Sequence, residues 1–92
     1  MKKTYHVRHI LVKERYLADD LIRKLKEGSV FADLARKFST CSSAENGGDL
    51  GPIPLGKADQ DFEEAAISLK PDEMTTSPVR TRFGYHIIQK IK

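Results

Sequence analysis

The chain has 92 residues, with a hydrophobic fraction of 39% and a charged fraction of 32%, which suits one globular domain spanning residues 1–92. No apolar run approaches the about 20 residues that cross a bilayer, so the composition excludes a membrane-inserted protein. The net charge of +3 comes from 16 basic and 13 acidic side chains interspersed along the chain, and this balance gives no reason to expect a nucleic-acid partner. Four of the basic residues could still form a basic patch: Lys13, Arg15, Arg80 and Arg82.

The expected location follows from the N-terminus and the cysteine content. Residues 1–6 include basic side chains but are not followed by an apolar segment, so no secretory signal is expected. The single cysteine, Cys41, has no partner for an internal disulfide, which agrees with a reducing compartment. We therefore expect a cytoplasmic protein, or an exported one if the chain is a domain of a longer protein.

The N-terminal half predicts a strand followed by two helices. Residues 7–12 are β-branched and apolar, as in a strand. From residue 16 the apolar spacing becomes helical, and Gly28 predicts the end of that helix. Ser29 is expected to cap a second helix. The apolar residues of both helices recur at helical spacing: Leu17, Leu21, Leu25, Phe31, Leu34, Ala35 and Phe38.

A loop and a third helix follow. Residues 39–49 are dense in turn formers and predict a surface loop of the kind that often carries function. Residues 50–54 contain two prolines and should form only a short edge strand. Asp61 and Glu64 have the spacing of a capping box, which predicts a helix over residues 61–69.

The C-terminal segment predicts a hairpin, with an edge strand over residues 77–81, a turn over 82–84 and a last strand over 85–91. The whole order predicts an α+β fold in which helices pack on a small antiparallel sheet. If the first and last strands pair at the centre of this sheet, strand alternation brings His9 and His86 together on one face.

Such a histidine pair has several interpretations. Buried imidazoles require hydrogen bonds, so His9 and His86 indicate either a site or a polar network that orders the sheet. With Cys41 they could instead form a Cys-His nucleophilic site or bind a metal, although no clustered ligand spacing supports a metal. The glycines favour turns and close packing over phosphate binding.

Five short motifs occur in order along the chain, at residues 9–13 (HILVK), 38–43 (FSTCSS), 47–51 (GGDLG), 62–65 (FEEA) and 83–88 (FGYHII). This ordered set covers nearly the whole chain and resembles the parvulin family of peptidyl-prolyl cis/trans isomerases. The resemblance implies a four-stranded antiparallel sheet surrounded by helices, a parvulin-like or FKBP-like architecture.

The resemblance also implies a set of site residues. Four polar side chains would form a catalytic network behind the rotating peptide bond: His9, Cys41, Thr81 and His86. Six residues would surround the substrate, with Leu50 and Phe62 holding the proline ring: Leu11, Leu50, Ala58, Asp59, Phe62 and Phe83. Ala58 stands where the family commonly has methionine, and Asp59 where it often has glutamine, so Phe62 is left to supply most of the contact with the ring.

The implied activity is rotation about X-Pro peptide bonds in peptides and unfolded proteins, assisting folding, without metal, cofactor, nucleic acid or membrane. A monomer is expected. Phosphate-directed members of the family carry a basic loop after the first strand, but here Lys13 and Arg15 run almost directly into a helix. Strict dependence on phosphorylated substrates is therefore not expected, although these two side chains could attract acidic residues. The alternative is a non-catalytic peptide-binding or chaperone module that uses the same cleft.

Overall fold

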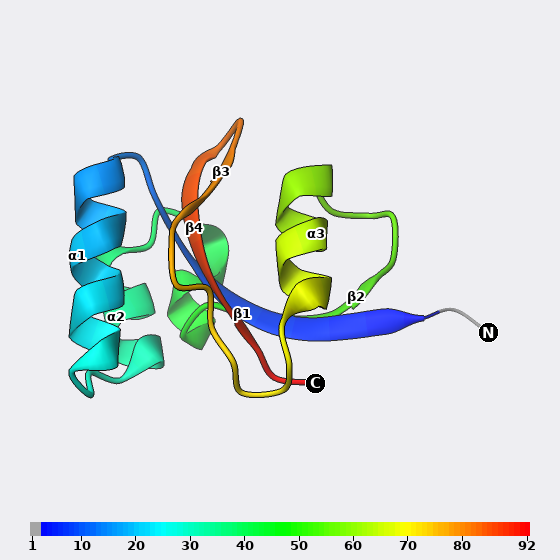
Figure 1. Cartoon of the computed structure of the whole chain (residues 1–92), viewed down its shortest axis with the longest axis horizontal. Coiled ribbons are helices and arrows are strands. Elements are labelled where there is room, and N and C mark those ends of the chain that lie inside the picture. The colour runs from blue at the N-terminus through cyan, green and yellow to red at the C-terminus, as the bar shows by residue number, and fades with distance from the viewer. Residues whose placement is uncertain (1–2) are drawn as a thin grey trace.

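The computed structural model describes residues 3–92, which form a four-stranded antiparallel sheet packed between helices (Figure 1). The strands lie in the order β2-β1-β4-β3. In chain order the elements are β1 (Thr4–Val12), α1 (Arg15–Lys26), α2 (Phe31–Phe38), the 3-10 helix η1 (Ser42–Asn46), β2 (Asp49–Pro54), α3 (Gln60–Ser68), β3 (Val79–Thr81) and β4 (Gly84–Lys90). The α+β fold expected from the sequence is confirmed.

The first and last strands, β1 and β4, are neighbours at the centre of the sheet. Their antiparallel register places His9 opposite Ile88 and Leu11 opposite His86. Because side chains alternate between the two faces of a strand, both histidines lie on the same face. Ile87 and Ile88 are adjacent in the sequence yet contribute to different cores, one on each face.

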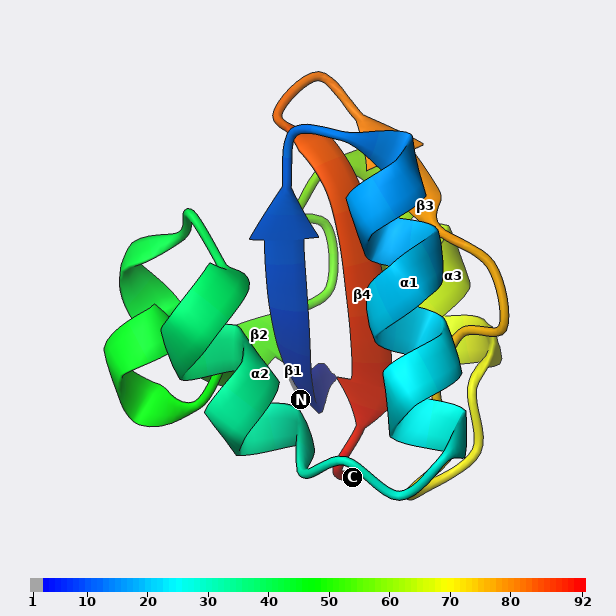
Figure 2. The same cartoon turned by 90° about the vertical axis from the view of Figure 1, so that its left-hand side faces the viewer.

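Helices α1 and α2 cover one face of β1 and β4, as Figure 2 shows. The fully buried centre of this face is apolar and includes Ile10, Leu21 and Ile87. Each helix presents a stripe of apolar residues at helical spacing to the sheet. Burial of these side chains is the main stabilising term on this face. None of the helices in the described part of the chain is both long and apolar enough to cross a membrane.

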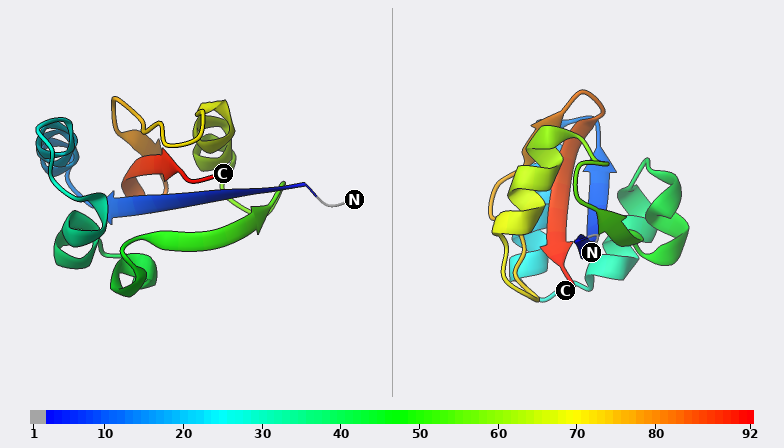
Figure 3. Two further views of the ribbon diagram at one scale, coloured as in Figure 1. Left: turned by 90° about the horizontal axis from the view of Figure 1, so that it is seen from below. Right: turned by 90° about the vertical axis from the view of Figure 1, so that its right-hand side faces the viewer.

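Helix α3 covers the opposite face of the sheet (Figure 3). Side chains of β2 pack on this face as well. Phe62 and Ala66 of α3 are buried against Val7 and Ile88. The Glu63 carboxylate fixes the helix further, since its Oε1 accepts hydrogen bonds from the Tyr5 hydroxyl (3.2 Å) and the Gly56 N–H (2.9 Å). Burial and the Glu63 carboxylate raise the pKa of Tyr5 to about 12, so this hydroxyl remains a donor.

The helix starts differ from those predicted. The cap of α3 is Asp59, whose side chain accepts a hydrogen bond from the Asp61 N–H (3.0 Å), rather than Asp61 itself. An Asp two residues upstream reaches the same free N–H groups, and the spacing pattern alone did not separate the two. The predicted cap of α2, Ser29, is also wrong, because Val30 occupies that position and no side chain caps the helix.

The loop predicted over residues 39–49 contains η1 and docks onto β1 beside His9. Gly48 makes this close approach possible, since it has φ +87° and a Cβ there would lie 2.3 Å from the His9 carbonyl oxygen. The His9 N–H donates to the Gly48 carbonyl (2.9 Å). The backbone of the loop is therefore fixed against the strand that carries His9. The prolines of β2 lie on an edge strand, as predicted.

Candidate functional site

The centre of the site is a hydrogen bond between the two histidine rings. His9 Nδ1 lies 3.0 Å from His86 Nδ1, and the ring centroids are 5.2 Å apart at 19° between planes. Each residue is only 4% exposed. Residues 77 positions apart in the sequence thus form one unit, and the predicted pairing of the histidines at the sheet centre is confirmed.

Thr81 extends this pair into a chain of hydrogen bonds. Its Oγ1 lies 2.7 Å from His86 Nε2 and accepts a hydrogen bond from the Phe83 N–H (3.2 Å). A single proton lies between the two Nδ1 atoms, so either ring can donate it. The series of hydrogen bonds can therefore run from His9 to Thr81 or from Thr81 to His9. In both directions its free end is His9 Nε2, which is buried and has no hydrogen-bond partner within residues 3–92.

Both histidines are neutral at physiological pH. Burial, with the His86 ring as a smaller cause, lowers the pKa of His9 to about 4. Burial also lowers the pKa of His86 to about 4, against an opposing effect of the Asp59 carboxylate. A neutral pair can hydrogen-bond without placing charge beneath an apolar pocket.

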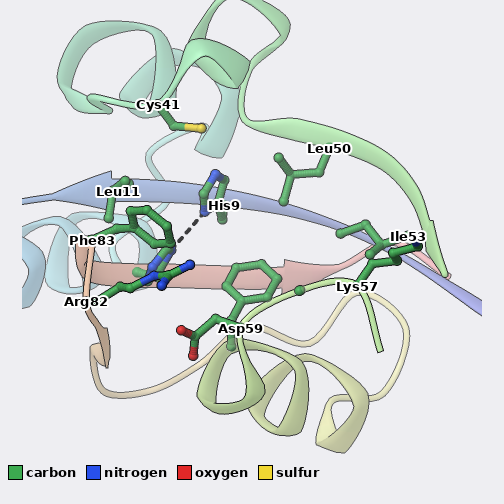
Figure 4. A pocket seen from close by; sticks show the side chains of 12 residues that line it. His9, Leu11, Cys41, Leu50, Ile53, Lys57, Asp59, Arg82 and Phe83 are labelled. Carbon is green, nitrogen blue, oxygen red and sulfur yellow. Dashed lines mark hydrogen bonds between the residues drawn. The ribbon is translucent and has the colours of Figure 1, made fainter. Parts of the chain in front are cut away.

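The histidine pair forms the floor of a pocket of about 380 Å³. Figure 4 shows side chains converging on it from several elements, including Leu11, Leu50 and Phe83. The lining residues are His9, Leu11, Cys41, Leu50, Ile53, Lys57, Ala58, Asp59, Phe62, Arg82, Phe83 and His86. All the predicted site residues except Thr81 line the pocket, and Thr81 lies behind it, bonded to His86.

The Phe62 ring stands edge-on to both imidazoles. Its centroid is 5.5 Å from that of His9 at 88° and 5.1 Å from that of His86 at 74°. Leu50 and Ala58 are half-buried and pack in the same cluster. Together these side chains make one wall apolar and close to the polar floor, an arrangement suited to a compact apolar ring attached to an amide.

Cys41 lies at the pocket but outside the hydrogen-bond network. Figure 4 shows its thiol on the side of His9 opposite the dashed hydrogen bond. None of the hydrogen bonds found within residues 3–92 joins this thiol to either histidine, and the backbone N–H of Cys41 donates to Ser39 Oγ (3.4 Å). The network expected from the sequence therefore contains Thr81 but does not include Cys41.

Three lining residues were not predicted: Ile53, Lys57 and Arg82. Ile53 alternates with the prolines of β2 and turns toward α3, a signal that its strand alternation could have given. Arg82 belongs to the turn between β3 and β4. The sequence had offered it only as part of a basic patch.

The other members of that basic patch lie outside the pocket. Lys13, Arg15 and Arg80 do not line it, and Arg15 forms an ion pair with Asp19 (3.8 Å). The two residues expected to attract acidic groups thus stand at the junction of β1 and α1, away from the floor of the site.

The structure also bears on the metal hypothesis. The described residues contain no group of three or more His, Cys, Asp or Glu side chains that could hold a metal ion. His9 Nδ1 and both nitrogens of His86 already have hydrogen-bond partners. The arrangement is that of a hydrogen-bonded floor with one free ring nitrogen.

Comparison with known families gives a match over nearly the whole chain. The model of the PPIC-type PPIase domain, termed Rotamase, matches residues 9–92. Foldase protein PrsA 2 of Listeria innocua is 48% identical over 87 residues, which cover 94% of this chain and 30% of that protein. The chain therefore spans about 30% of the length of foldase relatives such as this one.

Solved structures share the fold at similar identity. The crystal structure of PrsA from Bacillus subtilis superposes with a TM-score of 0.92 and 44% identity, covering 97% of this chain and 35% of that one. The solution structure of NmPin, the parvulin of Nitrosopumilus maritimus, gives a TM-score of 0.86 at 35% identity, and the two chains cover each other by 100% and 99%.

Proposed function

Because the chain belongs to the PPIC-type peptidyl-prolyl cis/trans isomerase family, the parvulins, it is a rotamase domain that assists folding, and we propose that the pocket above the histidine pair is its active site. The observation that carries this proposal is the neutral His9–His86–Thr81 chain under an apolar wall. On this proposal, residues 1–92 form one isomerase domain.

The chemistry demanded of such a site is modest. Rotation about an X-Pro bond crosses a barrier of roughly 20 kcal/mol that arises from amide resonance. A site lowers the barrier by binding the twisted amide better than either planar form. Desolvation of the amide and positioned hydrogen-bond donors both serve this end, and neither requires covalent attack.

The side chains at the pocket have different roles in this catalysis. Leu50 and Phe62 hold the proline ring, as their place in the apolar wall supports. The His9 ring is held by His86 and presents its free Nε2 atom, while Thr81 fixes the His86 ring from behind. Leu11 and Phe83 contact the residues flanking the proline.

Cys41 contributes polarity rather than acting as a nucleophile. Its thiol has no hydrogen-bonded base within the described residues, whereas an adjacent base is a common way to activate a cysteine nucleophile. Ala58 leaves the proline ring less enclosed than a methionine would, and Asp59 is engaged in capping α3. Both therefore act by shaping the wall, with Phe62 supplying most of the contact.

The decisive experiment measures cis/trans exchange of a proline peptide by NMR or by a protease-coupled assay. We expect the wild-type chain to accelerate exchange and a Phe62→Ala variant to lose most of that acceleration, with folding checked by circular dichroism. Tight binding of the peptide without faster exchange would instead identify a non-catalytic binding or chaperone module.

A paired comparison tests phosphate dependence. We expect a Ser-Pro peptide and its phosphorylated form to be turned over at rates within about one order of magnitude, because Lys13 and Arg15 do not line the pocket. A much faster rate on the phosphorylated peptide would contradict this.

The cytoplasmic location, its exported alternative and the monomeric state stay predictions.

A further inference from the structure

Arg82 is a cation at the rim of an otherwise largely apolar pocket. It follows Thr81 in the turn between β3 and β4, and its exposed side chain lines the pocket with Phe83 and His86. Figure 4 shows it reaching from this turn toward the pocket, beside Phe83. Its position brings a positive charge close to any residue bound next to the proline.

Two observations show that this charge is held in place and available. The Arg82 guanidinium lies over the Phe83 ring, 4.9 Å from its centroid, a cation-π contact that restricts the side chain. Within residues 3–92, no carboxylate forms an ion pair with Arg82. By contrast Arg15, Arg23 and Arg36 each pair with an acidic neighbour.

The other charges of the pocket do not cancel this one. Asp59 also lines the pocket and acts on the His86 ring against the effect of burial, but its Oδ1 accepts a hydrogen bond at the start of α3, where the helix dipole partly offsets negative charge. Lys57 adds a second positive charge among the lining residues. The pocket is therefore electrostatically suited to a carboxylate near its Arg82 end.

We propose that Arg82 is a specificity-determining residue, which favours substrates carrying an acidic side chain directly beside the isomerised proline. This inference rests on the proposed function, since it describes the substrates of that same pocket. The guanidinium would pair with the substrate carboxylate while Leu50 and Phe62 hold the ring. A planar fork of donors suits a carboxylate better than a point charge does.

The test compares kcat/KM for matched peptides with Glu or Gln beside the proline, in one series before it and in another after it. For an ion pair at an exposed rim we expect the wild type to prefer Glu by roughly threefold to fivefold in at least one series. The preference should fall toward unity in Arg82→Gln, persist in part in Arg82→Lys and weaken with added salt.

Arg80→Gln is the matched control. It removes the same positive charge two positions earlier in the chain, from a side chain that does not line the pocket. The preference should survive in this variant. If Glu and Gln peptides are turned over alike by the wild type, or if the preference persists in Arg82→Gln, the assignment is overturned while the isomerase function stands. If no proline peptide is turned over, the proposed function itself fails.

Discussion

The two faces of the central strands use the same backbone for different purposes. On the face covered by α1 and α2, Ile10 and Ile87 are fully buried in an apolar core. On the face covered by α3, the neighbouring positions hold His9 and His86 beneath an open pocket. A shift of one residue along each strand therefore separates an apolar core that supplies stability from the polar floor of the proposed active site.

The polar face depends on the apolar face for its support. Burying two imidazoles costs desolvation free energy, which the hydrogen bonds of the His9–His86–Thr81 chain and a firm backbone offset in part. The apolar face provides that firmness, because α1 and α2 pack on the same two strands.

Acid should weaken the polar face first. The unfolded histidines have a pKa near 6.5 and the folded ones near 4, so the unfolded chain binds more protons between these values. Stability is therefore greatest above about pH 6.5 and falls as the pH drops toward 4, by about 3 kcal/mol for each ring. Urea unfolding at a series of pH values measures this loss.

The double variant His9→Leu/His86→Leu serves as the control for this acid effect. Its stability should change much less between about pH 6.5 and pH 4, while its isomerase rate falls. An equally steep dependence in the double variant would assign the proton uptake to other groups. A double variant that keeps both the fold and the full isomerase rate would show that the pair is only structural.

Truncation on the apolar face should reduce stability alone. Ile10→Ala removes a fully buried side chain between the sheet and α1, which is expected to lower the free energy of unfolding by about 3 kcal/mol. kcat/KM per folded molecule should be unchanged at a temperature where the variant is folded. A large fall in kcat/KM would mean that the two faces are coupled.

The contact between the loop over residues 39–49 and β1 should be sensitive to substitution at Gly48. A Cβ at Gly48 meets the His9 carbonyl, whereas one at Gly51, with φ +70°, meets nothing within 4 Å. We expect Gly48→Ala to lower stability by about 2 kcal/mol or more and Gly51→Ala by about 1 kcal/mol. Thermal unfolding of the two variants measures the difference, and equal losses would show that backbone strain alone decides.

Truncation in the pocket should have the opposite pattern to that expected for Ile10→Ala. Leu50 is half-buried, so Leu50→Ala should cost little more than about 1 kcal/mol of stability. Its loss from the apolar wall should lower kcat/KM about tenfold, which corresponds to about 1.4 kcal/mol of binding to the twisted amide. An unchanged kcat/KM would move the proline ring elsewhere in the pocket.

The smallest effect is expected at Cys41. Cys41→Asp should retain part of the isomerase rate and Cys41→Ala somewhat less, because the side chain acts through its polarity beside His9. The same exchange assay measures both variants. Complete loss of turnover in both would instead indicate an essential nucleophile and add covalent chemistry to the polar face.

Much of this arrangement was predictable because strand alternation and helical spacing are local properties. On the hypothesis that the first and last strands pair, the alternation of residues 7–12 and 85–91 predicted His9 and His86 on one face, and the register confirmed it. The motif resemblance supplied most of the pocket wall. The pairing of the terminal strands was a hypothesis from the sequence, and the structure established it.

What escaped prediction depends on three-dimensional placement. Arg82 was visible only as a charged turn residue, and nothing local indicated that its guanidinium would lie over Phe83 at the pocket. The choice between Asp59 and Asp61 as helix cap was decided by the path of the chain entering α3. The position of the Cys41 thiol outside the hydrogen-bond network likewise depends on how its loop packs against β1, which no sequence pattern reports.

The central pairing of β1 with β4 has a consequence for how the site is made during synthesis. His9 leaves the ribosome early, but its partner His86 lies in the final strand of the fold. Until that strand docks, β1 lacks a neighbour along one edge, and long-range pairings of this kind form late. A nascent chain therefore holds no assembled imidazole pair, and the pocket proposed as the active site has no floor until the last strand has completed the sheet.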